Sequence, residues 1–139
     1  MTRSFNTSRA TAMLQSAGIR PTRQRTALAA ILFDGKPKHV SAEMIFAAAR
    51  KNRASVSLAT VYNNLHEFAD AGLLREVMVD HKFRYFDTTV TEHYHYFDEE
   101  TGCLYDVPER AMRLLRMPKA PSGKKIIRVD VIIRLCKAK

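Results

Sequence analysis

The sequence predicts an α+β fold in two parts. Helical periodicity dominates residues 7–70, two runs typical of β-strands follow at residues 73–79 and 83–86, and further short strand-like runs appear after residue 92. The chain has 139 residues, of which 46% are hydrophobic, so it suits one ordinary domain or two very small ones. A large multidomain enzyme is excluded on length alone.

Four helices are expected in the N-terminal part, each marked by a residue type that caps or ends a helix. Their expected ranges are 7–17 (before Gly18), 22–33 (from Thr22), 41–51 (from Ser41) and 57–71 (from Ser57, before Gly72). The two strands that follow, Leu73–Val79 and Phe83–Phe86, are joined by a short polar turn, which predicts a hairpin. Helices followed by a hairpin are typical of a winged helix-turn-helix domain, which we place at residues 1–86.

Residues 87–139 are expected to form a small C-terminal α/β domain. The expected elements are strands at His93–Phe97 and Cys103–Val107, a short helix from Pro108 to Arg116, and a third strand at Ile126–Leu135. A unit of about 50 residues with three strands and one helix buries little apolar surface on its own. We therefore expect it to be a dimerisation domain that completes its core against a second copy of the chain, in a homodimer.

The net charge of +9 is distributed unevenly along the chain. Residues 1–53 carry 10 basic and 2 acidic side chains, residues 87–109 carry 7 acidic and no basic ones, and residues 110–139 carry 10 basic and 1 acidic. The basic N-terminal segment favours a polyanionic partner, nucleic acid before membrane. The role of the basic C-terminal segment stays open.

The sequence also indicates where the protein acts. No apolar run approaches the roughly 20 residues that span a bilayer, and the N-terminus lacks the apolar core of a secretory signal. Two cysteines, Cys103 and Cys136, cannot form a disulfide framework, and we expect them to be half-buried thiols. A soluble cytoplasmic protein without a membrane partner is the expectation.

The fourth helix has the pattern of a DNA recognition helix. On its exposed face the first two turns are uncharged, whereas the acidic Glu67 and Asp70 are confined to the C-terminal half. The candidate DNA-contacting side chains on this helix are Ser57, Thr60, Tyr62 and Asn63. An asparagine suits a two-pronged contact with adenine, and a threonine suits a thymine methyl group. An ordinary solvated surface helix is the alternative interpretation of this pattern.

Basic residues around the second helix favour the DNA interpretation. Arg20, Arg23 and Arg25 precede or begin that helix, and Lys36 and Lys38 follow it. Such side chains supply the phosphate contacts that hold a recognition helix in register. We expect a dimer that binds a two-fold operator in double-stranded DNA.

The acidic block contains a candidate metal site. His93 and His95 are two residues apart on an expected strand, so both imidazoles point to one face. With Asp87, Glu92 and Asp106 in the same block, they suit Fe²⁺, Mn²⁺ or Zn²⁺, and imidazole also ligates haem iron. Exposed strand histidines without a ligand are the alternative. The remaining histidines, His39, His66 and His81, are individually expected to be surface residues.

Several motifs, in this order, resemble the ferric uptake regulator (Fur) family. They are Gly18-Ile19-Arg20-Pro21-Thr22-Arg23-Gln24-Arg25, His39-Val40-Ser41-Ala42-Glu43, Ser57-x-Ala59-Thr60-Val61-Tyr62, and the stretch from Ala71-Gly72-Leu73 through Phe86-Asp87 to His93-x-His95. The resemblance implies a winged-helix DNA-binding domain and a dimerisation and metal-sensing domain. It implies that Arg20 lies in or near the minor groove. It also implies a regulatory metal set at His39, Asp87, His93 and His95, joined in some members by Asp106.

Two departures narrow the resemblance. The arginine usual after the tyrosine is Asn63, and the cysteine pair that normally holds structural zinc falls on Asp98 and Thr101, so no structural zinc site of four cysteines is expected. Both features resemble the iron response regulator (Irr) branch, which implies haem bound through His93 and His95. That branch also implies DNA binding in low iron, and a haem-biosynthesis enzyme or a protease as a further partner.

Three other functions are left as alternatives. The nearest is a conventional Fur-type repressor in which Fe²⁺ or Mn²⁺ acts as co-repressor. A small metal-dependent hydrolase is disfavoured because His93-x-His95-x-x-Asp98 only approximates a hydrolase pattern, so we expect a regulator and not an enzyme. A metal-storage or delivery protein would explain the acidic block but not the uncharged start of the fourth helix.

Overall fold

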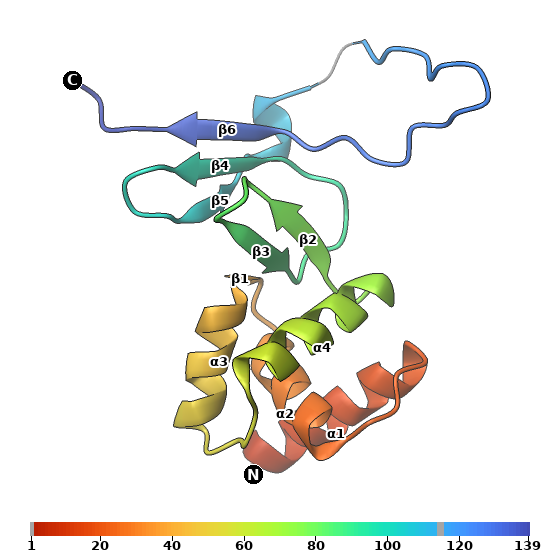
Figure 1. Cartoon of the computed structure of the whole chain (residues 1–139), viewed down its shortest axis with the longest axis vertical. Coiled ribbons are helices and arrows are strands. Elements are labelled where there is room, and N and C mark those ends of the chain that lie inside the picture. The colour runs from red at the N-terminus through yellow and green to blue at the C-terminus, as the bar shows by residue number, and fades with distance from the viewer. Residues whose placement is uncertain (1, 114–115) are drawn as a thin grey trace. The chain divides into compact units, whose positions relative to one another are not determined.

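The chain divides into two compact units, Met1–Val90 and Thr91–Lys139. The structure, a computed structural model, describes residues 2–113 and 116–139, with side chains from residue 7 onward (Figure 1). The division falls after Val90 and not after residue 86. The last strand of the first unit includes Asp87, and the Thr88 N–H donates to the Lys38 carbonyl at 3.1 Å, which keeps this stretch with the first unit.

The four helices expected in the N-terminal unit are confirmed: α1 (Thr2–Ser16), α2 (Arg23–Leu32), α3 (Ala42–Lys51) and α4 (Leu58–Asp70). The hydroxyl side chains of Thr22, Ser41 and Ser57 cap the last three, each accepting a backbone N–H from three residues onward at 3.1–3.2 Å. Gly18 and Gly72 follow α1 and α4 with φ of 76° and 83°, a left-handed conformation that ends a helix at little cost for glycine.

The apolar faces of these helices form the core of the unit. The most buried contributors are Leu14, Leu28, Leu32, Val61, Leu65 and Phe68, together with Phe86 from the sheet, and all are fully buried. Each such side chain contributes roughly 1.5–3 kcal/mol relative to an exposed one. The core therefore fixes which face of α4 points outward.

The N-terminal unit is completed by an antiparallel sheet with the strand order β1-β3-β2. Its strands are β1 (His39–Val40), β2 (Arg75–Met78) and β3 (Arg84–Asp87). The predicted hairpin is confirmed as β2–β3, and its turn is held by Asp80, which accepts the N–H groups of Lys82 and Phe83 at 2.8 and 3.0 Å. We call this hairpin the wing. Strand β1 was not predicted, because two residues carry no periodicity.

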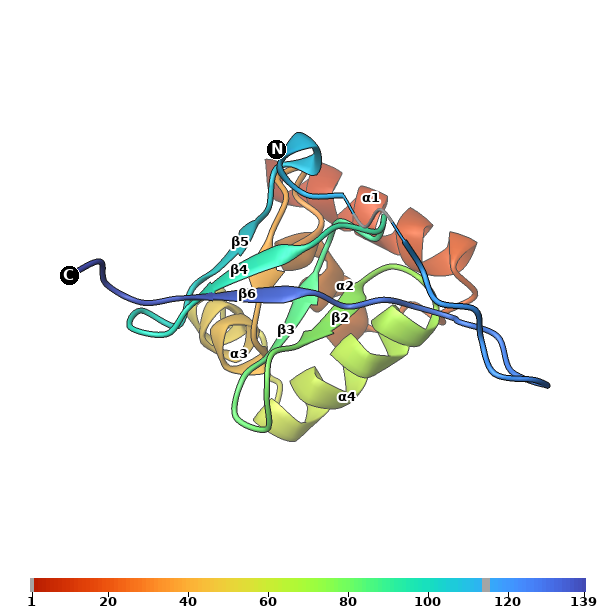
Figure 2. The same cartoon turned by 90° about the horizontal axis from the view of Figure 1, so that it is seen from above.

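The C-terminal unit contains a second sheet with the order β5-β4-β6, built from β4 (His95–Asp98), β5 (Leu104–Asp106) and β6 (Ile132–Leu135). Figure 2 shows the three strands side by side. Strands β4 and β5 are antiparallel, and β4 and β6 are parallel. Among the described residues of this unit, the buried apolar side chains are Phe97, Leu104 and Val107.

Two of the strands predicted for this unit have different bounds in the structure. The first strand begins at His95 and not at His93, and the third covers only Ile132–Leu135 of the expected ten residues 126–135. The third strand is short because its partner β4 has four residues, and each of them is paired, from His95 with Ile132 to Asp98 with Leu135. Strand-forming residues beyond the end of a partner strand have no ladder to join, and Ile127 is 87% exposed.

The helix expected from Pro108 to Arg116 is reduced to a single 3-10 turn, Glu109–Ala111. Pro108 precedes this turn in an extended conformation, with φ −56° and ψ 134°, and Met112 follows it in an extended conformation as well. Residues 114–115 of the expected helix lie outside the described residues. In the described part of the chain, no helix is long and apolar enough to cross a membrane.

Candidate metal ligands and DNA recognition helix

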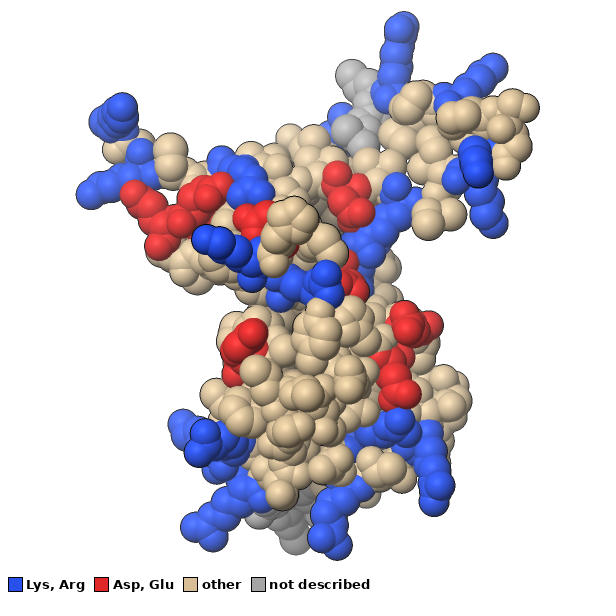
Figure 3. Space-filling model, viewed as in Figure 1, with Lys and Arg blue, Asp and Glu red and all other residues tan. Residues whose placement is uncertain are grey.

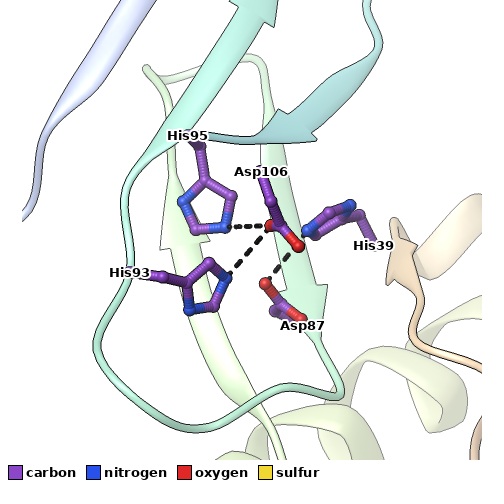
Figure 4. Close-up of side chains that lie close together, drawn as sticks. All are labelled: His39, Asp87, His93, His95 and Asp106. Atoms are coloured by element: carbon purple, nitrogen blue, oxygen red, sulfur yellow. Dashed lines mark ion pairs between the residues drawn. The ribbon is translucent and has the colours of Figure 1, made fainter. Parts of the chain in front are cut away.

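His39 and Asp87 form a histidine–carboxylate pair in the N-terminal unit. They are direct cross-strand partners in the β1–β3 ladder, which brings His39 Nε2 within 3.1 Å of Asp87 Oδ2 (Figure 4). The other carboxylate oxygen, Oδ1, accepts the Thr89 N–H at 2.8 Å, and Asp87 is only 1% exposed. A carboxylate held by a backbone N–H presents its second oxygen in a fixed direction, as metal ligands are usually held.

The C-terminal unit builds a similar set around Asp106. His95 and Asp106 are cross-strand partners in the β4–β5 ladder, and Asp106 Oδ1 lies 3.5 Å from His95 Nε2 and 3.2 Å from His93 Nε2 (Figure 4). The two imidazole rings are neighbours, with centroids 4.4 Å apart. His93 precedes β4, so the prediction that both histidines project from one strand was wrong, although their rings do converge on the same carboxylate.

The contacts of His93 indicate which of its nitrogens could bind an ion. His93 Nδ1 lies 2.6 Å from the Thr91 carbonyl oxygen. Because a carbonyl oxygen only accepts, Nδ1 carries a proton, and Nε2 of a neutral ring then points its lone pair at the Asp106 carboxylate. A lone pair facing an anion is stabilised only by a proton on the ring or by a cation between them. The donor set thus fits a cation.

The type of ligand narrows the choice of cation. Both sets offer imidazole nitrogens and carboxylate oxygens, which suit Fe²⁺, Mn²⁺ and Zn²⁺ and do not select soft, thiol-preferring ions. Cys103 and Cys136 are exposed, so the expectation of half-buried thiols was wrong. Glu92 is exposed as well, and no contact with either ligand set is described for its side chain.

The exposed face of α4 agrees in most positions with the face predicted from the sequence. Val61, Leu65 and Phe68 are buried, and Asn63 is exposed. Leu58, which helical spacing places on the same side as Val61 and Leu65, is 41% exposed, whereas Asn64 is buried at 8%. The buried arc is therefore rotated towards Asn64, and the physical reason is that Asn64 has two hydrogen-bond partners in its buried position.

Arg25 is one of those partners, and its side chain makes three contacts within the N-terminal unit. Its Nε donates to Asn64 Oδ1 at 3.1 Å, its Nη1 donates to the Arg20 carbonyl at 3.1 Å, and its Nη2 lies 2.5 Å from Glu67 Oε2. Asn64 Nδ2 in turn donates to the Thr60 carbonyl at 2.9 Å. The Arg25 side chain thus ties α2 to α4.

Two of the other candidate DNA contacts are also engaged locally. Ser57 Oγ accepts the Thr60 N–H at 3.1 Å and donates to Thr60 Oγ1 at 2.8 Å, so both hydroxyl groups belong to the helix cap. Arg20 and Arg23 are exposed. On the face shown in Figure 3, Lys and Arg side chains surround the end of the N-terminal unit that its helices form.

Sequence reasoning missed His66, which it treated as a solvated histidine. Its Nδ1 lies 3.5 Å from Glu76 Oε2, and its ring contacts the rings of Tyr62 and Phe86 at centroid distances of 4.6 and 5.5 Å. A signal was present, because His66 follows Tyr62 by four residues and therefore lies on the same side of the helix. Glu76 and Phe86, its partners on the wing, are distant in the sequence, so no helical spacing predicts their contact with His66.

An N-terminal unit of four helices and a wing defines the chain as a winged-helix protein. The model of the ferric uptake regulator family matches residues 16–132, and the chain belongs to that family. It is 36% identical over 95 residues to a peroxide-responsive repressor PerR of Staphylococcus aureus, an alignment that covers 68% of this chain and 64% of the relative. The matched region thus spans less than two thirds of that relative's length.

Solved structures show the same fold. The ferric uptake regulator of Pseudomonas aeruginosa with manganese aligns with a TM-score of 0.66 at 22% identity, covering 94% of this chain and 98% of that one. The ferric uptake regulator of Francisella tularensis with iron aligns with a TM-score of 0.68 at 17% identity, covering 86% and 92%. At these identities the comparison concerns the fold.

Proposed function

We propose that this protein is a metal-responsive transcription regulator that binds a double-stranded DNA operator as a homodimer and uses Fe²⁺ or Mn²⁺ as its signal. The observation that carries the proposal is the convergence of His93 Nε2 and His95 Nε2 on Asp106 Oδ1, at 3.2 and 3.5 Å. A site with this donor chemistry in a family of winged-helix regulators supports a sensor. The two related structures, one with manganese and one with iron, support the choice of ion.

The recognition helix in this proposal is α4. Asn63 contacts a base edge, because it is exposed near the N-terminal end of the helix and carries both a donor and an acceptor. Tyr62 lies beside it, and Thr60 offers its methyl group. Arg20 and Arg23 contact phosphates, since both are exposed and basic, whereas Arg25 and Ser57 hold the helix in place.

The regulatory ligands are His39, Asp87, His93, His95 and Asp106, as the family resemblance implies. Two of them belong to the N-terminal unit and three to the C-terminal unit. Metal binding then shifts the population towards the form that binds the operator. The protein's own contribution is to hold each carboxylate opposite its histidine across a strand pair.

The test is operator binding with and without metal. A duplex selected from a random pool is titrated with metal-free protein and again with Mn²⁺, and we expect tighter binding with Mn²⁺. Asp106→Asn should lose most of that response, whereas Glu100→Gln, which removes an exposed acid from the same unit, should keep it. Equal affinity with and without Mn²⁺ in the wild-type protein contradicts the proposal.

A haem-responsive regulator is the second candidate. Asn63, the absence of cysteine at residues 98 and 101, and the neighbouring imidazoles of His93 and His95 favour it. On this branch haem relieves DNA binding, so haem and Mn²⁺ change operator affinity in opposite directions. Because His95 is only 3% exposed, an axial bond to haem requires the site to open. A haem absorption spectrum that is unchanged in a His93→Ala/His95→Ala variant argues against it.

A further inference from the structure

Four side chains meet where α4 lies beside the wing. Tyr62 and His66 belong to α4, Glu76 to β2 and Arg84 to β3. Arg84 Nε lies 2.9 Å from Glu76 Oε1, Arg84 Nη1 donates to the Tyr62 hydroxyl oxygen, and the same Nη1 lies 3.4 Å from His66 Nε2. The guanidinium carbon is 5.9 Å from the centre of the Tyr62 ring. Arg84, which lies on the wing, therefore holds Tyr62, the residue next to Asn63.

The direction of each hydrogen bond follows from Arg84. A guanidinium only donates, so the Tyr62 oxygen accepts, and the His66 Nε2 that faces Arg84 carries no proton. The His66 proton then lies on Nδ1, which is the nitrogen that faces Glu76 at 3.5 Å. With Arg84 on its oxygen, the Tyr62 O–H proton points elsewhere and is left to donate to another group.

The rings support the same arrangement. His66 packs against Tyr62 with the planes at 71° and against the buried Phe86 at 88°, both edge-to-face contacts. His66 thus connects the exposed tyrosine ring to the core. One side of Tyr62 rests on this histidine and its hydroxyl end is bound by Arg84, so the free rotation expected of an exposed tyrosine is restricted.

We infer that Arg84 is a positioning residue for DNA recognition: from the wing it orients Tyr62 so that the phenol donates a hydrogen bond to an acceptor on the DNA. This inference rests on the proposed DNA-binding function. The charge of Arg84 is offset by Glu76 at 2.9 Å, which disfavours a direct role as a phosphate contact. The wing and the recognition helix consequently bind DNA as one rigid element.

The test is a double-mutant cycle on operator affinity with Arg84→Met and Tyr62→Phe, measured at several salt concentrations. Losing one hydrogen bond of this kind corresponds to about a 3- to 10-fold weaker Kd for Arg84→Met. In the Tyr62→Phe background the same change should have less than about a 2-fold effect, because the group it orients is gone. The salt dependence should be that of the wild-type protein.

The opposite pattern overturns the inference. If Arg84→Met weakens binding equally in both backgrounds and lowers the salt slope by about 1, Arg84 contacts a phosphate directly. Arg84→Lys keeps the charge but not the forked geometry, so we expect it to bind as weakly as Arg84→Met, and full rescue by lysine contradicts a positioning role. Arg134→Met, which removes an arginine paired with Glu99 in the other unit, is the matched control.

A second measurement uses the free protein and stays informative if no operator is bound. Nitrogen NMR of the imidazoles should show His66 protonated on Nδ1 in the wild-type protein, and the Tyr62 and His66 ring signals should shift in Arg84→Met. A His66 proton on Nε2, or ring signals unaffected by the substitution, overturns the arrangement itself. Failure of the wild-type protein to bind any duplex overturns the proposed function instead.

Discussion

His95 and Asp106 face each other directly across the β4–β5 ladder, and the C-terminal unit thereby places an imidazole nitrogen 3.5 Å from a carboxylate oxygen. His39 and Asp87 have the same relationship across β1–β3. In each unit the backbone ladder, and not the flexibility of long side chains, sets the spacing of the two ligands. Sites built on strands in this way are positioned before an ion arrives.

Replacing His95 by alanine should weaken Mn²⁺ binding strongly. The side chain is buried and its Nε2 lies beside the shared carboxylate oxygen, so its loss removes one ligand and leaves Asp106 less well oriented. Removal of an outer-shell partner of a metal ligand weakens metal affinity by about 10- to 100-fold. We expect His95→Ala to weaken Mn²⁺ affinity by at least that much, as measured by calorimetric titration. Glu100→Gln serves as control, and unchanged Mn²⁺ affinity in His95→Ala removes it from the ligand set.

Replacing Asn63 by alanine should reduce sequence discrimination and not general affinity for DNA. A two-pronged contact with a base contributes about 1–3 kcal/mol of discrimination, whereas it releases no counterions. The ratio of operator to random-duplex affinity should therefore fall, with an unchanged salt slope. Asp70→Ala, on the same exposed face of α4 near its C-terminal end, is the control, and it should keep the ratio.

Arg25 and Arg23 should behave differently although they lie two residues apart. Arg25→Met removes donors to the buried Asn64 and to Glu67, and we expect the free energy of unfolding to fall by about 1–3 kcal/mol in urea titration.

Arg23→Met, at an exposed position, should change stability by no more than about 0.5 kcal/mol. It should instead lower the salt slope of DNA binding by about 1. An Arg25 variant as stable as the wild-type protein would show that the bridge between α2 and α4 contributes little.

Asp98 should make the C-terminal unit more stable at neutral than at acid pH. The backbone N–H of Glu100, and then that of Thr101, lower the pKa of the Asp98 carboxyl below its usual value of 3.8. Because the folded state favours the charged form, this contribution is present above about the usual pKa and is lost as the pH falls through the lowered one.

Asp98→Asn keeps an acceptor oxygen but loses the charge. Its urea midpoint should therefore lie below that of the wild-type protein at pH 7, and the difference should shrink at acid pH. Glu100→Gln controls for loss of a surface charge. If the urea midpoints of Asp98→Asn and the wild-type protein differ by the same amount at pH 7 and at acid pH, the lowered pKa of Asp98 does not contribute to stability.

Asp98 also shows how a family position can change its role. By resemblance, residues 98 and 101 occupy the places of a zinc-binding cysteine pair. In this chain Asp98 Oδ1 accepts the N–H groups of Glu100 and Thr101 at 2.9 and 3.3 Å, and Thr101 Oγ1 accepts the Cys103 N–H at 3.3 Å. The turn between β4 and β5 is thus closed by hydrogen bonds.

Local signals in the sequence determined much of the N-terminal unit. The caps at Thr22, Ser41 and Ser57 are interactions between residues a few positions apart, and each appears in the structure where it was expected. The turn at Asp80 is of the same kind. The fold class and the outward position of Asn63 follow from such signals.

Only the tertiary structure decided the rest, because it depends on partners far apart in the chain. Strand β1 exists because His39 and Val40 find β3, some 50 residues onward, and β6 ends where β4 offers no further partner. His66 was expected in solvent, yet it is bound by residues of the wing, and Arg25 is bound by residues of α4. A sequence shows which side chains can bind, and the packing of the elements decides which of them are already engaged.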